Sequence, residues 1–229
     1  GDKRVLPYLT ALRDWAVAGQ HQSKWEVPAL GHGPSGLPYD QKSLVAPSCH
    51  LLVFEALARR CGMESEIWEL LLPYMTLAWS DPKEGGHGSL GYNKSYKDLA
   101  EFWSRSGLFA MAAELRGEEE EMEDAMISFM HGHHPWIRNS HAYGEPGGSW
   151  GLVAMNLCAP EKYDEVIRSY AWWFSLAWEP GYGLRFTTPH MGAPYMGEDD
   201  LINATYALVL QSSKRNLHIT GFEESEKRK

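Results

Sequence analysis

Amphipathic helical periodicity recurs along almost the whole chain and constrains its fold more than any other feature. In residues 161–178, apolar side chains from Tyr163 to Trp178 follow the i, i+3, i+4, i+7 spacing of a helix with one buried face. Gly62 and Gly117 stand where glycines commonly end helices. The pattern predicts eight helices and no convincing strand, over residues 4–18, 47–61, 65–79, 96–116, 119–131, 148–158, 161–178 and 198–213.

Glycine-rich segments that resemble one another lie between the predicted helices. GHGPSG (31–36) and GHGSLG (86–91) are each followed by a tyrosine and then by a helix, and GEPGGSWG (144–151) and GYGLRF (181–186) are looser copies. Both GHG copies match the dinucleotide-binding pattern GxGxxG, but neither follows an apolar strand as that motif requires. Self-similarity of this kind predicts loops between about four stacked helical hairpins.

Two stretches carry a resemblance to a known superfamily. GGHGSLGYNKSYKDLAEFWSRSGLFAMAAEL (85–115) resembles a repeat of the α/α toroids, which include protein prenyltransferase β subunits and terpene cyclases. DDLINATYALVLQ (199–211) is similar to the last helix of the prenyltransferases, with Asp200, Tyr206 and Leu208 at matching positions. The resemblance implies an all-α fold, with about four hairpins forming a partial or open toroid.

The departures from that superfamily concern its metal chemistry. In prenyltransferases, a zinc-binding Asp and Cys precede an aromatic pair that resembles Phe102 and Trp103 here. The residues before this pair in the present chain are Lys97, Asp98 and Leu99. Asn203 stands where the resemblance implies a zinc-binding histidine. The DxDD motif of proton-initiated cyclases is absent, and Asp199 of the partial DDxxD match is explained by the helix dipole. We therefore expect neither a metal nor another cofactor.

Composition narrows the class of protein and of partner. The chain is 44% hydrophobic and 22% charged, which is typical of a globular domain. We expect one toroid-like domain over residues 1–221 and a charged tail over 222–229.

A net charge of -9 argues against nucleic acid, and no apolar run is long enough for membrane insertion. Ten Trp and eleven Tyr favour a small-molecule or carbohydrate ligand. Further domains of a longer parent chain stay open as partners, and the localisation is undetermined.

The segment HGHHPWIRNSHAY (131–143) combines two different patterns. HGHH lacks a recognised zinc-ligand spacing, and we interpret it as the end of a helix. In the following RNSHAY, Asn139, His141 and Tyr143 alternate, so they would point the same way in an extended loop. These residue types suit the cleavage of uronic-acid polymers by polysaccharide lyases, some of which use related α/α scaffolds. A turn whose polar side chains bind its own backbone would explain them equally well.

If equivalent loops lie at one end of a toroid, the candidate residues gather around one mouth. We assign His87 or His141 as the base, Tyr143 as the acid and Arg185 as the group that neutralises a carboxylate. Trp150 and Tyr182 would stack against sugar rings. The full set of predicted ligand-binding residues is His32, Tyr92, Asn139, Glu145, Trp150, Tyr182, His190, Asp200 and Asn203.

Three functions follow from these features and stay open. The first is binding, or lyase-type or hydrolytic cleavage, of a carbohydrate such as a uronic-acid polysaccharide. The second is an isoprenoid enzyme, similar to a prenyltransferase or terpene cyclase, with an altered metal site. The third is a domain without catalytic activity that binds a protein or peptide.

Overall fold

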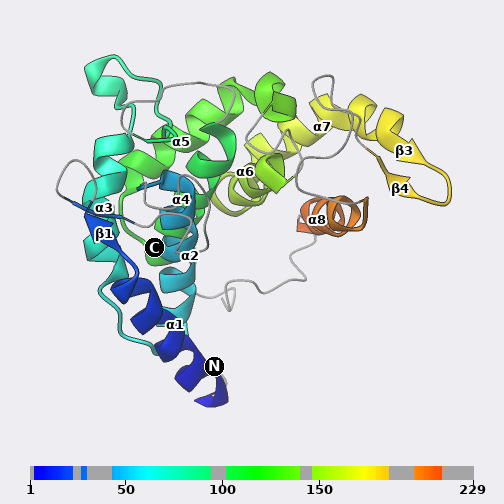
Figure 1. Ribbon diagram of the computed structural model, residues 1–229. Coiled ribbons are helices and arrows are strands. Elements are labelled where there is room, and N and C mark those ends of the chain that lie inside the picture. Colours follow the sequence, from blue (N-terminus) through cyan, green and yellow to red (C-terminus); the bar gives the residue numbers. More distant parts are fainter. Residues whose placement is uncertain are drawn as a thin grey trace.

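The computed structural model describes residues 3–22, 27–29, 43–93, 102–139, 146–185 and 199–212. Within these ranges it contains eight α-helices, and each overlaps a helix predicted from the periodicity (Figure 1). The all-α prediction is therefore confirmed. The helices are α1 (Leu6–Ala18), α2 (Val45–Arg60), α3 (Ile67–Ala78), α4 (Phe102–Arg116), α5 (Glu120–Gly132), α6 (Pro146–Cys158), α7 (Pro160–Ala177) and α8 (Asp199–Gln211).

The remaining regular elements in the described ranges are short. The strands form two antiparallel pairs, β1 with β2 and β3 with β4, each only two residues long per strand. The 3-10 helices are η1 (Lys3–Val5), η2 (Pro82–Glu84) and η4 (His134–Asn139), and the strands are β1 (His21–Gln22), β2 (Pro28–Ala29), β3 (Trp178–Glu179) and β4 (Gly183–Leu184).

The helices are arranged in two layers. The even-numbered helices α2, α4, α6 and α8 pack in succession, each against the next, and form an inner row. The odd-numbered helices lie outside it, with α3 against α2, α5 against α4 and α7 against α6 (Figure 1). This alternation is the one that stacked helical hairpins produce. The toroid itself stays a prediction, because the described helices extend as a row.

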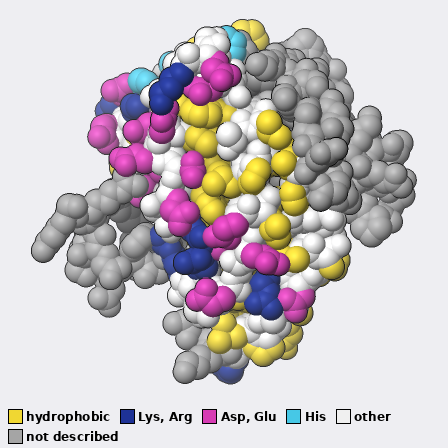
Figure 2. Space-filling model, turned by 90° about the vertical axis from the view of Figure 1, so that its left-hand side faces the viewer, with side chains coloured by type: hydrophobic (Ala, Val, Ile, Leu, Met, Phe, Trp, Pro, Cys, Tyr) yellow, Lys and Arg dark blue, Asp and Glu magenta, His cyan; other side chains and the backbone are white. Residues whose placement is uncertain are grey.

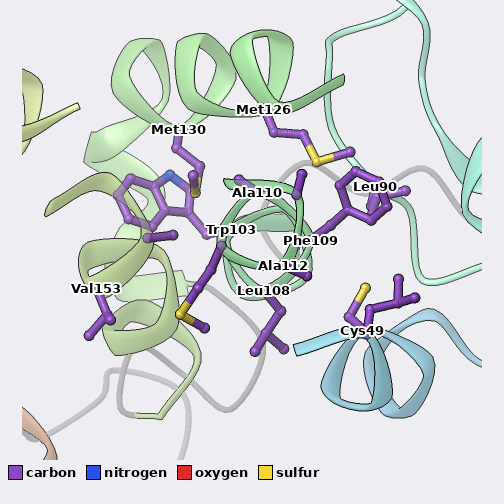
Figure 3. Packing of buried hydrophobic residues seen from close by; sticks show 14 of the residues in the cluster. Cys49, Leu90, Trp103, Leu108, Phe109, Ala110, Ala112, Met126, Met130 and Val153 are labelled. Atoms are coloured by element: carbon purple, nitrogen blue, oxygen red, sulfur yellow. The ribbon is translucent and has the colours of Figure 1, made fainter. Parts of the chain in front are cut away.

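Helix α4 is the centre of the core. From Trp103 to Leu115, every residue except Glu114 is buried, because α2, α5 and α6 all pack against this helix. Figure 3 shows its side chains pointing outward in several directions, with Trp103 against Met130 of α5. A helix that is apolar around most of its circumference is expected in the interior of a protein. Its small residues let the neighbouring helices approach closely.

Helices α4 and α6 approach closely through two glycines, and this contact bears on one prediction. A Cβ added at Gly107 would lie 2.6 Å from the Cα of Gly151, and one added at Gly151 would overlap the ring of Trp103. The sequence predicted both a hairpin loop in GEPGGSWG (144–151) and a helix over 148–158; α6 begins at Pro146, so the helix prediction holds over the end of the motif and the loop prediction does not. Gly151 is explained by this helix contact rather than by a turn.

Two other predicted helix-ending glycines have the backbone expected of them. Gly62 follows α2 with φ of 86°, and Gly117 follows α4 with φ of 75°. Both angles lie in the left-handed region, which glycine adopts without a steric penalty. The N–H of Gly117 donates to the carbonyl of Ala113 at 2.7 Å, which closes the last turn of α4.

The loops after α3 and α7 share one backbone pattern, although their lengths differ. Trp79 directly follows α3 and forms an antiparallel bridge with Leu90, within GHGSLG. Trp178 directly follows α7 and pairs in the same way with Leu184, within GYGLRF. The similarity of these two glycine-rich segments therefore corresponds to a similar structure. The first copy, GHGPSG, lies outside the described residues.

The next inner helix anchors each loop through one polar side chain. The Leu90 N–H donates to Oγ of Ser106 on α4 at 3.1 Å. The Leu184 N–H donates to Oδ1 of Asn203 on α8 at 2.7 Å. Helices α4 and α8 thus occupy equivalent places, with Ser106 and Asn203 at equivalent positions.

Candidate functional site

The β3–β4 hairpin presents a polar and aromatic group to solvent. The guanidinium carbon of Arg185 lies 5.3 Å from the centre of the Tyr182 ring, a cation–π distance. Nη1 of Arg185 donates to Oε2 of Glu179 at 3.2 Å. Tyr182 is 64% exposed, and the side chains of Arg185 and Glu179 are each about half exposed. A ring, a cation and a carboxylate therefore lie together where a ligand can reach them.

The register of the hairpin separates this group from an apolar surface. Trp178 pairs with Leu184, and Glu179 pairs with Gly183. Directly paired residues share a face, and successive residues alternate between faces. Trp178 and Leu184 are consequently on one face, and Glu179 with Arg185 is on the other. The ion pair of Glu179 and Arg185 therefore belongs to the second face.

Asn203 supports the hairpin from α8. Besides accepting the bond from the Leu184 N–H, its Nδ2 donates to the carbonyl of Tyr182 at 3.2 Å and to that of Leu184 at 3.3 Å. Three predicted site residues, Tyr182, Arg185 and Asn203, are therefore brought together by the structure. The polar atoms of Asn203 bind the backbone of the hairpin that carries the other two residues.

A second arginine–tyrosine pair lies inside the molecule. The guanidinium carbon of Arg105, which is fully buried, lies 5.2 Å from the centre of the Tyr92 ring. Burial raises the pKa of the nearby Cys49 thiol, and the charge of Arg105 opposes that rise only in part. Burial also raises the pKa of Tyr74, whose hydroxyl donates to the carbonyl of Ser43 at 2.8 Å. Cys49 and Tyr74 thus stay protonated near neutral pH.

Arg105 was not among the residues predicted for the site, although Tyr92 was. Its only signal in the sequence is a charge within the apolar helix between Trp103 and Phe109. Such a charge normally belongs to the solvated side of a surface helix. Only the burial of α4 on all sides shows that this arginine is internal.

Trp150 contacts the inner helix α2 through its ring. It is half-buried in the first turns of α6, and its ring meets His50 of α2 edge-on with centroids 5.8 Å apart. The contact therefore joins the two inner helices that flank α4. His50 is exposed, and its Nδ1 lies 2.8 Å from the carbonyl of Ala46.

His87 is exposed in the loop after α3, and its backbone N–H donates to Oγ of Ser80 at 3.0 Å. This loop lies against α5, because a Cβ at Gly88 would come within 2.8 Å of the carbonyl oxygen of Ala125. In Figure 1, α3 and the β3–β4 hairpin lie at opposite ends of the row. The structure therefore does not bring His87 and Arg185 together around one mouth.

The HGHH segment is the end of α5, as its pattern indicates. His133 Nδ1 lies 3.0 Å from the carbonyl of Phe129, and His134 Nδ1 lies 2.8 Å from that of His131. His131 Nε2 pairs with Glu165 of α7 at 2.9 Å. These histidines bind their own helix or the neighbouring one. Among the described residues, no group of three or more His, Cys, Asp or Glu could hold a metal ion.

A partly buried ion cluster joins four segments through Arg116, at the C-terminal end of α4; the side chains of Glu69 and Glu118 are about half exposed. The arginine bonds Glu55 of α2 at 2.8 Å, Glu69 of α3 at 2.9 Å and Glu118, just before α5, at 2.9 Å. Its guanidinium also lies 5.5 Å from the centre of the Trp68 ring. The side chain of Glu55 has no exposed surface. We interpret this cluster as structural.

The remaining predicted site residues lie at the ends of elements or outside the described ranges. Asn139 ends η4, and Asp199 and Asp200 begin α8, where the predicted dipole interaction places them. The predicted residues that lie outside the described ranges are His32, His141, Tyr143, Glu145 and His190.

Large apolar side chains are exposed near both ends of the row. At one end they belong to α1, and at the other they belong to α7 and β3. Hydrophobic side chains also form a band on the face shown in Figure 2, with acidic and basic side chains beside it. The exposed residues at the two ends are Val5, Tyr8, Leu12 and Trp15, and Trp172, Leu176 and Trp178.

No helix within the described ranges is both long and apolar enough to cross a membrane.

Comparison with known proteins identifies a family but no activity. No curated protein and no solved structure matches the chain. A family model described as a domain of unknown function, DUF6288, matches residues 1–221. The chain therefore belongs to the DUF6288 family.

Proposed function

We propose that the β3–β4 hairpin binds an acidic carbohydrate, such as a segment of a uronic-acid polysaccharide. The single observation that carries the proposal is the exposed group formed by Tyr182, Arg185 and Glu179. An aromatic ring can stack on a sugar, and a guanidinium binds a carboxylate in a bidentate manner. A carboxylate beside them can accept bonds from sugar hydroxyls.

The existing ion pair does not prevent such binding. Arg185 and Glu179 are both about half exposed, and exposed ion pairs contribute only about 0–1 kcal/mol. A uronate carboxylate can therefore compete with Glu179 for the guanidinium. Asn203 holds the turn in place through its bonds to the backbone, so the ring and the cation are presented in a defined geometry.

Lyase-type cleavage is the catalytic form of this proposal, and it rests on the sequence. In such a reaction a base removes the C5 proton of a uronate, and the bond from C4 to the leaving oxygen breaks as a C4–C5 double bond forms. An acid protonates the leaving oxygen. We propose His141 as the base and Tyr143 as the acid. Arg185 would neutralise the carboxylate during proton removal.

The binding proposal is tested by titration with uronic-acid oligosaccharides and with neutral oligosaccharides of equal length. We expect wild type to bind the acidic oligomers, and Arg185→Gln to weaken that binding about tenfold, since charge-assisted hydrogen bonds are stronger than neutral ones. Tyr182→Ala should weaken it comparably. Arg168→Gln, an exposed arginine on α7, is the matched control and should bind like wild type. Equal binding of neutral oligomers, or no effect of Arg185→Gln, would contradict the proposal.

Cleavage is tested separately with a panel of uronic-acid polymers. Activity should produce the absorbance of the conjugated double bond, and Tyr143→Phe should abolish it while leaving binding intact. Binding without this absorbance would support a carbohydrate-binding domain and exclude the lyase.

A protein ligand is the second candidate function. The observation that favours it is the exposed apolar surface of Trp172, Leu176 and Trp178, which are 52%, 79% and 61% exposed. Exposed apolar groups of this size often mark protein interaction sites. The two candidates are separable, because Leu176→Glu should abolish protein binding and leave carbohydrate binding unchanged.

A further inference from the structure

The two charges on the β3–β4 hairpin cancel. Within residues 178–185, which read WEPGYGLR, the only charged side chains are one acid, Glu179, and one base, Arg185. They form the exposed ion pair, with Oε2 of Glu179 3.2 Å from Nη1 of Arg185. The hairpin therefore offers a single cation, and a carboxylate already lies beside that cation.

This arrangement limits how many ligand carboxylates the hairpin can accept. A carboxylate that binds the guanidinium of Arg185 lies close to Glu179, because Glu179 contacts the same guanidinium. A second carboxylate on the next sugar would add to the repulsion by Glu179, since like charges side by side are unfavourable. The hairpin has no second cation to offset that repulsion. A neutral sugar in the same place could instead donate its hydroxyls to Glu179.

The aromatic ring provides a separate contact for a neighbouring sugar. The guanidinium of Arg185 lies over the ring of Tyr182, 5.3 Å from its centre, and so occupies one face of the ring. Tyr182 is 64% exposed, so a ligand can reach the ring without displacing the guanidinium. The apolar face of a sugar can stack there. The cation and the ring can thus hold two successive units of an oligosaccharide.

The charge of the whole chain acts in the same direction. The formal net charge is -9, and a surplus of negative charge opposes the approach of a densely charged polyanion. A ligand with widely spaced carboxylates is repelled less. Local and overall charge therefore favour the same kind of ligand.

We propose that Glu179 makes the hairpin selective for acidic oligosaccharides in which neutral units separate the carboxylated ones. Arg185 binds the carboxylate of one unit, and Tyr182 and Glu179 contact a neutral neighbour. The inference rests on the proposed function, because it assumes that the hairpin binds an acidic carbohydrate. It adds the class of ligand and assigns Glu179 as the residue that determines specificity. Arg185 provides affinity, and Glu179 disfavours densely charged chains.

The experiment is calorimetric titration with galacturonate tetramers that differ only in charge. One tetramer is fully ionised, one keeps a single free carboxylate on an interior unit and is otherwise methyl-esterified, and one is fully esterified. At about 0.1 M salt, wild type should bind the singly ionised tetramer about threefold more tightly than the fully ionised one. Higher salt should reduce this preference, because it screens the repulsion.

Glu179→Gln tests the assigned residue, since it keeps the size of the side chain and removes its charge. Its affinity for the fully ionised tetramer should rise about fivefold, and more than its affinity for the singly ionised one, so the preference is lost. Asp164→Asn is the matched control. It removes the same charge from an exposed position on α7, about 20 Å along the helix from its end, and should keep the wild-type preference.

The results separate this inference from the proposed function. If no tetramer binds, or if the fully esterified tetramer binds as well as the others, the proposed function is contradicted and the inference fails with it. If the acidic tetramers bind but wild type does not prefer the singly ionised one, only the inference is overturned. The same holds if Glu179→Gln retains the wild-type preference.

Discussion

Gly107 of α4 and Gly151 of α6 lie in direct backbone contact, and an added Cβ at Gly107 would come within 2.6 Å of the Cα of Gly151. The contact is at the centre of the inner row, where α4 and α6 make their most extensive packing. We predict that Gly107→Ala lowers the free energy of unfolding by about 1–3 kcal/mol or more, because the backbone cannot move aside as a flexible side chain could. Urea denaturation measures the change.

Gly132→Ala is the control for this prediction. Gly132 is the last residue of α5, and a Cβ there would meet no atom within 4 Å. The substitution should leave stability unchanged or raise it by up to about 1 kcal/mol, because alanine restricts the unfolded chain. Equal effects of the two substitutions would contradict the close contact.

Asn203→Ala should release the β3–β4 hairpin from α8. The variant loses one bond accepted from the Leu184 N–H and two donated to carbonyls of the hairpin. We expect a loss of about 1–3 kcal/mol in local stability, since hairpin groups would be left without these partners. Hydrogen exchange measures it as faster exchange at the amide of Leu184.

Ser106→Ala is the reciprocal control, because Ser106 anchors the other loop through the N–H of Leu90. It should accelerate exchange at Leu90 and leave Leu184 unchanged, whereas Asn203→Ala should do the reverse. Changes at both amides in both variants would indicate global destabilisation and argue against separate anchors.

Glu55 should make stability depend on pH. Its pKa is raised from 4.5 to about 7, chiefly because burial disfavours the carboxylate, and the nearby Arg116 opposes this rise. Between these pH values the folded protein holds the proton more tightly than the unfolded chain does. The contribution of Glu55 to stability therefore falls as pH rises from about 4.5 to about 7.

Glu55→Gln removes this titration. We expect the stability of the variant relative to wild type to increase over the same pH range, as measured by urea denaturation at several pH values. If wild type instead gains relative to the variant as pH rises, attraction by Arg116 outweighs burial and the pKa of Glu55 is lowered. Asp164→Asn, on the exposed side of α7, is the control and should show no comparable trend.

Arg105→Lys should be destabilising although it preserves the charge. The buried guanidinium lies over the ring of Tyr92, and a lysine cannot provide the same planar group with several donors. We expect a loss of about 1–3 kcal/mol in free energy of unfolding, measured by thermal or urea denaturation, because a buried charged group would lose favourable contacts. Arg168→Lys, at an exposed position on α7, should change stability by less than about 0.5 kcal/mol.

The sequence by itself determined the helices, because their signal is local. The spacing of apolar residues reflects which side of each helix is buried, and it predicted all eight described helices. It also predicted the glycines that end α2 and α4, where a left-handed backbone is required. Tyr182 and Arg185 were predicted as site residues from their glycine-rich loop, and they do lie together.

Only the tertiary structure decided what depends on contacts between distant segments. A glycine in a turn and a glycine at a close helix contact cannot be distinguished by residue type, so the glycines of GEPGGSWG were compared with loop glycines although Gly151 packs against α4. Likewise, the sequence did not show that Arg105 is buried, because its burial depends on the packing of α2, α5 and α6 around α4. The separation of His87 from Arg185 follows from the direction in which the row extends, because similarity between loops carries no information about their distance.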